Sequence, residues 1–172
     1  MHPFVAWIVM NATFVVWHIP AAYEFALGGE IWHTFEHLCF FACSVLFWWL
    51  IVRPWPSHVL FSEWILIPYL LLSDLVNTGL SAFLCFSGRL LYPSYAEVER
   101  PFGLGALNDQ VAAGAFMWVF GSIVFLVPAV LIMGRLLSSR TMSLQMQVQS
   151  DRKQSGFLDV SEKCLLSRTD SE

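Results

Sequence analysis

Six residues that could bind a metal ion lie within or beside long apolar stretches of the chain. They are three histidines, two carboxylates and one thioether, namely His18, His33, Glu36, His37, Asp109 and Met117. In a segment that crosses a membrane, a charge at mid-depth costs ~2.5–3.5 kcal/mol or more, so such residues by default mark function. Imidazole is the commonest metal ligand in proteins, and thioether or thiolate partners favour copper(I). The residue types therefore predict a copper site.

The spacing of the histidines predicts that they lie close together. His33 and His37 are spaced i, i+4 and share one helix face, with Glu36 beside it. At ~1.5 Å per residue, His18 lies ~14 Å before the end of its apolar run, and His37 lies ~11 Å into the next. A very short Gly28-Gly29 turn joins the two runs, so they should pack as antiparallel neighbours with these histidines at similar depth.

The fourth apolar run adds two further candidates. Asp109 enters that run from the same side of the membrane, and Met117 lies ~12 Å further in. We expect all six residues to form one cluster in the outer half of a helix bundle.

Three other interpretations of the histidines stay open at this point. They could hydrogen-bond between helices without a metal, or His18 and His37 could ligate haem from facing helices. The segment His33-Thr34-Phe35-Glu36-His37 also fits the H-x-x-E-H pattern of inverted zinc proteases.

Other polar residues in the apolar runs favour a structural role. Asp74 is expected to bond Ser73, Asn77 or Asn11 within the bundle. Cys39 and Cys43 share a helix face with Glu36, but small cysteines are more often packing residues than ligands.

Composition indicates an integral membrane protein. The chain has 172 residues, of which 57% are hydrophobic and only 13% charged, and it has no basic patch for nucleic acid. The last 36 residues carry five of the nine basic and five of the 13 acidic groups. An apolar body is thus followed by a polar tail.

We predict an all-α fold, a polytopic transmembrane helix bundle of about four spans. The transmembrane domain covers residues 1–137, and Pro20 should kink the first span near its end. Residues 138–172 are expected to form a disordered polar tail. The spans are expected at residues 3–27, 31–52, 60–87 and 107–136.

The distribution of Lys and Arg predicts the orientation of the bundle. Basic residues near the span ends favour the side that carries Arg53, Arg135 and Arg140, while Arg89 and Arg100 on the other side are offset by Glu97 and Glu99. We therefore expect the N-terminus, the 53–59 loop and the tail to be cytoplasmic.

Several short stretches, taken in order, resemble the CtaG-type cytochrome c oxidase assembly proteins. Together they cover nearly all of residues 2–125. They are His2-Pro3, Trp17-His18-x-Pro20-x-x-Tyr23, His33-x-x-Glu36-His37-Leu38, Phe47-Trp48-Trp49, Phe86-Ser87, Leu91-Tyr92-Pro93-x-Tyr95 and Asp109-Gln110-x-x-Ala113-Gly114-x-x-Met117-Trp118.

The resemblance implies a non-enzymatic factor that assembles a haem–copper terminal oxidase by handling copper for its subunits. His18, His33 and His37 would then be copper ligands, with Asp109 and Met117 as supporting or transfer ligands. The implied location is the bacterial cell inner membrane, where the chain contacts lipid. Members of the family usually have further apolar spans before the His2-Pro3 opening, so the resemblance leaves open whether such spans are missing here. The sequence does not predict an oligomeric state.

Overall fold

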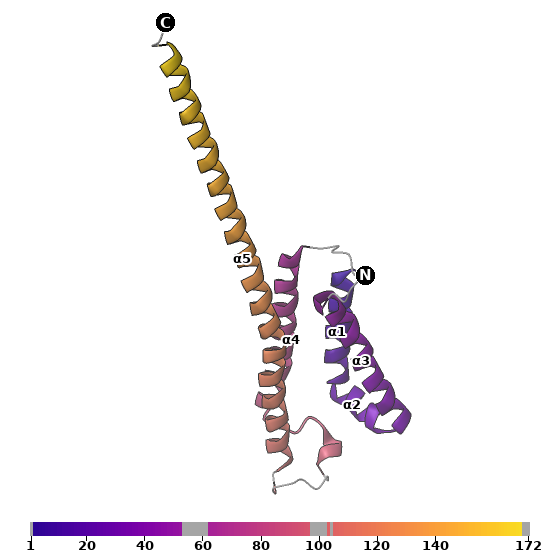
Figure 1. Ribbon diagram of the computed structural model, residues 1–172. Helices are drawn as coiled ribbons and strands as arrows, with labels where there is room; N and C mark the ends of the chain where they lie inside the picture. The colour runs from indigo at the N-terminus through magenta and orange to yellow at the C-terminus, as the bar shows by residue number, and fades with distance from the viewer. Residues whose placement is uncertain (1, 53–61, 97–102, 104, 170–172) are drawn as a thin grey trace. The chain divides into compact units, whose positions relative to one another are not determined.

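The computed structural model describes residues 2–52, 62–96, 103 and 105–169, with side chains described up to residue 149 and at Arg152. Every regular element in these residues is helical, which confirms the all-α prediction. The chain divides into two compact units, Met1–Val130 and Leu131–Glu172. The helices of the first unit, which holds the candidate site, can be followed along the chain in Figure 1.

The first apolar run folds as two helices. α1 spans Pro3–Trp17 and α2 spans Pro20–Leu27, and the pair is bent by 75° at the break. Proline lacks an N–H and disfavours the helical conformation for the residue before it. Ile19 accordingly has an extended backbone with φ −67° and ψ 128°. The predicted kink at Pro20 is confirmed.

The remaining runs form three long helices with two short helical turns between them. Within the described residues, three helices are long and apolar enough to cross a membrane, or four if the bent pair α1–α2 is one span. This agrees with the prediction of about four spans. The elements are α3 (Glu30–Val52), η1 (Glu63–Ile65), α4 (Leu66–Phe86), η2 (Pro93–Tyr95) and α5 (Ala106–Thr169).

The bounds of the last helix differ from the predicted span. α5 continues past residue 136 to Thr169, through a stretch that contains no proline and one glycine. In the second unit, every side chain from Leu137 to Gln149 is exposed. A helix without tertiary packing is marginal in water, and the disorder of residues 138–172 stays a prediction.

Phe47 is the centre of the apolar core of the first unit. Its side chain is 0% exposed, and its ring stacks on Tyr69 of α4 with centroids 4.5 Å apart. It also meets Phe125 of α5 edge-on at 5.9 Å. One aromatic side chain of α3 therefore contacts the two following long helices.

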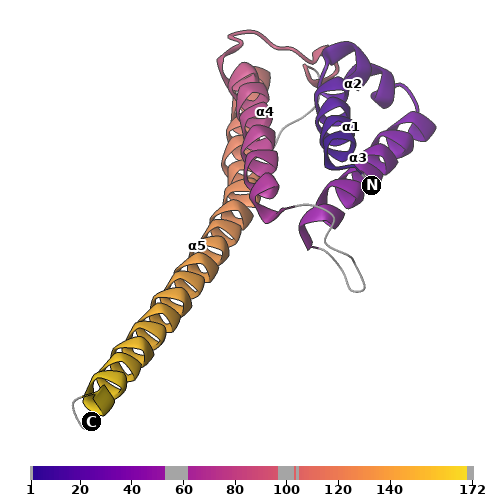
Figure 2. The ribbon, with the colours of Figure 1, turned by 90° about the horizontal axis from the view of Figure 1, so that it is seen from above.

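α1 lies between α3 and α4, as Figure 2 shows from above. The Trp7 indole N–H donates to the Tyr69 carbonyl oxygen at 3.1 Å, and the Asn11 amide donates to Ser73 Oγ at 3.2 Å. These bonds satisfy polar groups that would be costly to leave unpaired in a bilayer. The bond of Asn11 goes to Ser73 and not to Asp74, whose buried Oδ1 has no hydrogen-bond partner in the described part of the chain.

Two glycines let α5 approach α4 closely. A Cβ atom at Gly114 would lie 3.0 Å from Cys85 Sγ, and one at Gly121 would lie 2.4 Å from Asn77 Nδ2. The two positions are seven residues apart and so share one face of α5. This packing holds the start of α5 against the end of α4, where the candidate site lies.

Candidate functional site

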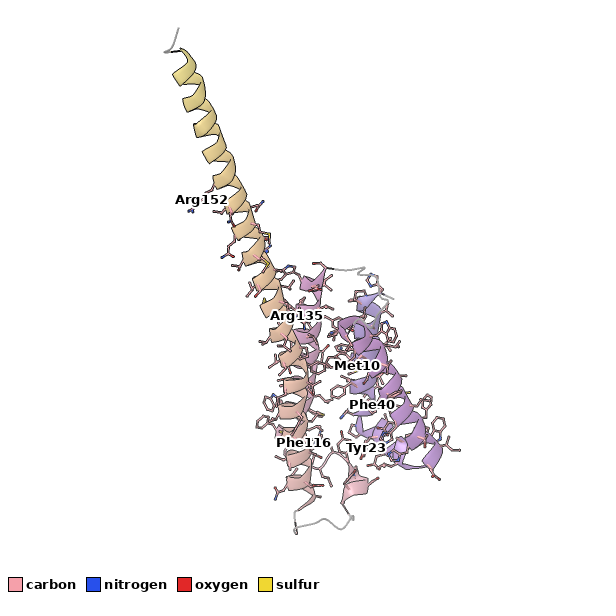
Figure 3. All side chains as sticks on the ribbon, viewed as in Figure 1. Met10, Tyr23, Phe40, Phe116, Arg135 and Arg152 are labelled. Carbon is pink, nitrogen blue, oxygen red and sulfur yellow. The ribbon has the colours of Figure 1, made fainter. Side chains whose placement is uncertain are left out.

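A cavity of about 280 Å³ lies in the first unit, bounded by the α1–α2 break, α3, the end of α4, the η2 connection and the start of α5. Its walls are mostly aromatic and apolar, and its charged side chains are carboxylates. The lining residues are Trp17, His18, Tyr23, Glu36, Phe40, Leu84, Leu90, Tyr92, Tyr95, Ala106, Asp109, Gln110, Ala113 and Met117. Tyr23 on α2 and Phe40 on α3 are labelled in Figure 3.

His18 lies at the break between α1 and α2 and lines the cavity. Its Nδ1 is 2.7 Å from the Phe14 carbonyl oxygen, which can only accept, so Nδ1 carries the hydrogen. In the neutral ring, Nε2 then keeps its lone pair, which is the arrangement of a metal-ligating histidine. The rings of Phe14 and Phe40 lie 4.7 and 6.2 Å from the imidazole and hold it in place.

Two carboxylates and a thioether line the same cavity. Glu36 of α3 is only 8% exposed and lies within electrostatic range of His18. Asp109 and Met117 come from α5 and are half-buried. Four of the six predicted ligands are therefore brought together by elements far apart in the sequence.

The other two predicted ligands lie on a different face. The His33 and His37 rings contact each other at 4.7 Å, with their Nε2 atoms 3.1 Å apart, and both side chains are exposed. Neither lines the cavity, because the face of α3 that contains Glu36 and Phe40 is the one turned inward. The expectation of a single cluster is thus replaced by a cavity group and a separate histidine pair.

The separation of His33 and His37 from the cavity bears on the haem and zinc-protease interpretations. Haem ligation by His18 and His37 needs facing rings, but only His18 lines the cavity. The zinc-protease pattern needs Glu36 beside His33 and His37, but Glu36 is buried while both histidines are exposed. Within the residues that the structure describes, no group of three or more His, Cys, Asp and Glu side chains is arranged to hold a metal ion. A bound ion would have to draw the cavity residues together.

The η2 connection covers one side of the cavity with tyrosines. The Tyr23 hydroxyl donates to the Tyr95 hydroxyl at 2.7 Å, and the rings of Tyr23 and Tyr92 are 4.6 Å apart. The Ser94 N–H and hydroxyl both donate to the Glu24 carboxylate, the N–H at 3.1 Å. Side chains of α2 therefore tie down the segment that carries two lining residues.

Gln110 anchors the other end of this connection. Its Oε1 accepts from the Leu91 N–H at 2.8 Å, and its Nε2 donates to Ser87 Oγ at 3.0 Å and the Arg89 carbonyl at 3.2 Å. Gln110 is 8% exposed, so these bonds are protected from water. One side chain of α5 thus sets the path of the chain that leaves α4.

Sequence reasoning did not assign a role to Gln110 or to the tyrosines. Tyr23, Tyr92, Tyr95 and Gln110 all stand in the stretches that carry the family resemblance. Their place in those stretches was the one indication in the sequence that they matter. Their hydrogen bonds join residues that are separated by between 19 and 74 positions in the chain, and local spacing does not reveal such contacts.

A family described as cytochrome c oxidase caa3 assembly factor (Caa3_CtaG) matches residues 1–139 of the chain. The match covers the whole first unit and so includes every residue that lines the cavity. No curated protein and no solved structure matches the chain.

Proposed function

Because the chain belongs to the cytochrome c oxidase caa3 assembly factor family, we propose that it binds copper(I) as cargo and delivers it to a subunit of a haem–copper oxidase. The observation that supports copper most is the shared cavity of His18, Glu36, Asp109 and Met117. A neutral imidazole and a thioether are ligands that copper(I) prefers, and a carboxylate offsets its charge. The role is non-catalytic.

The His33–His37 pair fits an earlier step, the capture of the ion at the surface. Its two Nε2 atoms, 3.1 Å apart, are close enough for both to lie ~2 Å from one metal ion, the distance known for zinc–imidazole sites. Both rings are exposed on the outside of the bundle, within the first two turns of α3. Copper would then pass to the cavity, where Met117 and His18 hold it away from water.

Copper stoichiometry of the detergent-purified chain tests the proposal. We expect His18→Ala and Met117→Leu to weaken copper(I) binding by about tenfold or more, a loss of ~1.4 kcal/mol or more. His2→Ala and Met142→Leu, which change the same residue types outside the cavity, should bind as wild type does. Equal copper in all five proteins would mean that the cavity does not bind the ion and would favour a metal-free scaffold. A Soret band in the absorption spectrum would favour haem instead.

The proposed location is the bacterial inner membrane, with the cavity toward the outer face and the tail in the cytoplasm. This orientation rests on the basic residues of the sequence, of which Arg53 and Arg100 lie outside the described residues. In a Cys164→Ser background, Arg89→Cys should react with a membrane-impermeant thiol reagent on intact cells, whereas Gln145→Cys should not. The reverse pattern would invert the topology.

A further inference from the structure

Three sulfur-containing side chains lie on α1 and α3, outside the cavity. They belong to Met10 of α1 and to Cys39 and Cys43 of α3, and both cysteines are free thiols with half-buried side chains. None of the three residues lines the cavity. We refer to these residues as the sulfur seam; Met10 is labelled in Figure 3.

Two contacts across the helices place Met10 and Cys43 within one turn of each other. The Thr13 hydroxyl is 3.4 Å from Cys43 Sγ, and the Ser44 hydroxyl is 4.0 Å from Met10 Sδ. Met10 and Thr13 are one turn apart on α1, while Cys43 and Ser44 are adjacent on α3. Cys39 lies one turn from Cys43 along α3, toward the end that carries Glu36.

We propose that the sulfur seam is a second binding site, for a soft monovalent metal ion. Thiolate and thioether are the ligands that select copper(I) over harder cations. On binding, the Cys43 thiol gives its proton to solvent and a metal–sulfur bond replaces the S–H bond, with no change of oxidation state. One thiolate and one thioether then hold the ion in a neutral complex, which suits a low-dielectric interior where net charge is costly.

The position of Cys39 indicates where an ion would pass from this site. Cys39 lies on α3 between Cys43 and Glu36, which lines the cavity, so an ion at Cys43 and Met10 can pass to Cys39 and then toward Glu36 and His18. The identity of the ion as copper and this transfer rest on the proposed function. The existence of a soft-metal site in the sulfur seam does not depend on the proposed function.

The chain contains a matched control for the seam. Cys85 of α4 is also free and half-buried, but its thiol donates to the Val111 carbonyl oxygen at 3.6 Å, so this contact is to an oxygen of α5. Cys43→Ser is a mild variant, because a serine hydroxyl can still bond Thr13.

Silver(I), a redox-inert analogue of copper(I), is the probe for the test. The full-length purified chain is titrated with silver(I), its cysteines are alkylated, and each labelled peptide is quantified by mass spectrometry. We expect silver(I) to protect Cys39 and Cys43 from alkylation at concentrations that leave Cys85 reactive. Met10→Leu and Cys43→Ser should each raise the silver(I) concentration needed for half-protection of Cys39 by on the order of tenfold, and Cys85→Ser should not change it.

The proposal would be overturned if silver(I) protected Cys85 as readily as Cys39 and Cys43. It would also be overturned if the protection persisted unchanged in Met10→Leu. His18→Ala separates this result from the proposed function, because it removes a cavity ligand and should leave silver(I) protection in the seam intact. Loss of seam protection in His18→Ala would mean that the seam is not an independent site. Intact protection with unchanged copper binding in His18→Ala would contradict the cavity and retain the seam.

Discussion

The Tyr92 hydroxyl donates a hydrogen bond to the His18 carbonyl oxygen at 2.9 Å, and so ties the connection after α4 to the break in the first span. The backbone ladder of α2 begins with Tyr23 donating to Ile19, one residue after His18. Tyr92 therefore supplies a donor to a carbonyl at the break, where a proline interrupts the helix. The same bond keeps a tyrosine ring against the cavity that His18 lines.

Replacing Tyr92 by Phe should destabilise the first unit by ~1–3 kcal/mol, because it leaves a backbone carbonyl without that donor. Thermal unfolding of the purified chain in detergent measures the change. Tyr95→Phe is the control, since the Tyr95 hydroxyl accepts a bond near the surface and its side chain is 38% exposed. A loss in Tyr95→Phe as large as in Tyr92→Phe would contradict this explanation.

Burial also raises the pKa of the Tyr92 hydroxyl above its ordinary value. A group whose pKa is higher in the folded state stabilises the fold below its unfolded pKa, ~10 for tyrosine, and the contribution is lost as the pH rises through the folded pKa. We expect the unfolding free energy of wild type to fall more steeply above about pH 10 than that of Tyr92→Phe. Unfolding midpoints measured from about pH 8 to 12 would test this, and parallel curves would contradict it.

Gln110→Leu should loosen the connection between α4 and η2. The change removes an acceptor from the Leu91 N–H and donors from Ser87 and the Arg89 carbonyl, and each buried group left unpaired costs ~1–3 kcal/mol. Limited proteolysis should then cut within residues 88–105 faster than in wild type. Gln145→Leu, at an exposed position of the second unit, is the matched control and should be cut at the wild-type rate. Equal rates in wild type and Gln110→Leu would contradict the anchoring role.

Gly121→Ala should destabilise the α4–α5 packing, whereas Gly79→Ala should not. A Cβ at Gly121 would lie 2.4–2.6 Å from three atoms of the Asn77 side chain, while one at Gly79 would meet nothing within 4 Å. Overpacking of this kind typically costs ~1–3 kcal/mol, and alanine in place of an unhindered helical glycine gains ~0.5–1 kcal/mol. The unfolding midpoint in detergent measures both.

The double variant Asn77→Ala with Gly121→Ala tests the stated cause of that loss. If the clash with the Asn77 amide is responsible, the two changes together should cost less than the sum of the single changes. If the losses of the two single variants simply add in the double variant, the strain does not come from the contact with the Asn77 side chain.

The apolar runs, the break at Pro20 and the identity of the polar residues inside the runs followed from the amino-acid sequence alone. Length and hydropathy suffice for a span, and a proline acts on its own backbone and on the residue before it. The same local reasoning identified His18, Glu36, Asp109 and Met117 as candidates, because ionisable and thioether side chains in apolar helices are conspicuous wherever the helices lie.

The grouping of those candidates was decided by tertiary structure. Which face of α3 turns inward depends on the helices that pack against it, through contacts such as Phe47 with Tyr69 and Phe125. That rotation buries Glu36 and leaves His33 and His37 exposed, although all three stand within five residues. The tyrosine cover and the Gln110 anchor likewise join residues far apart in the chain. Local spacing reveals which side chains share a helix face, but only the packing of whole helices determines what that face meets.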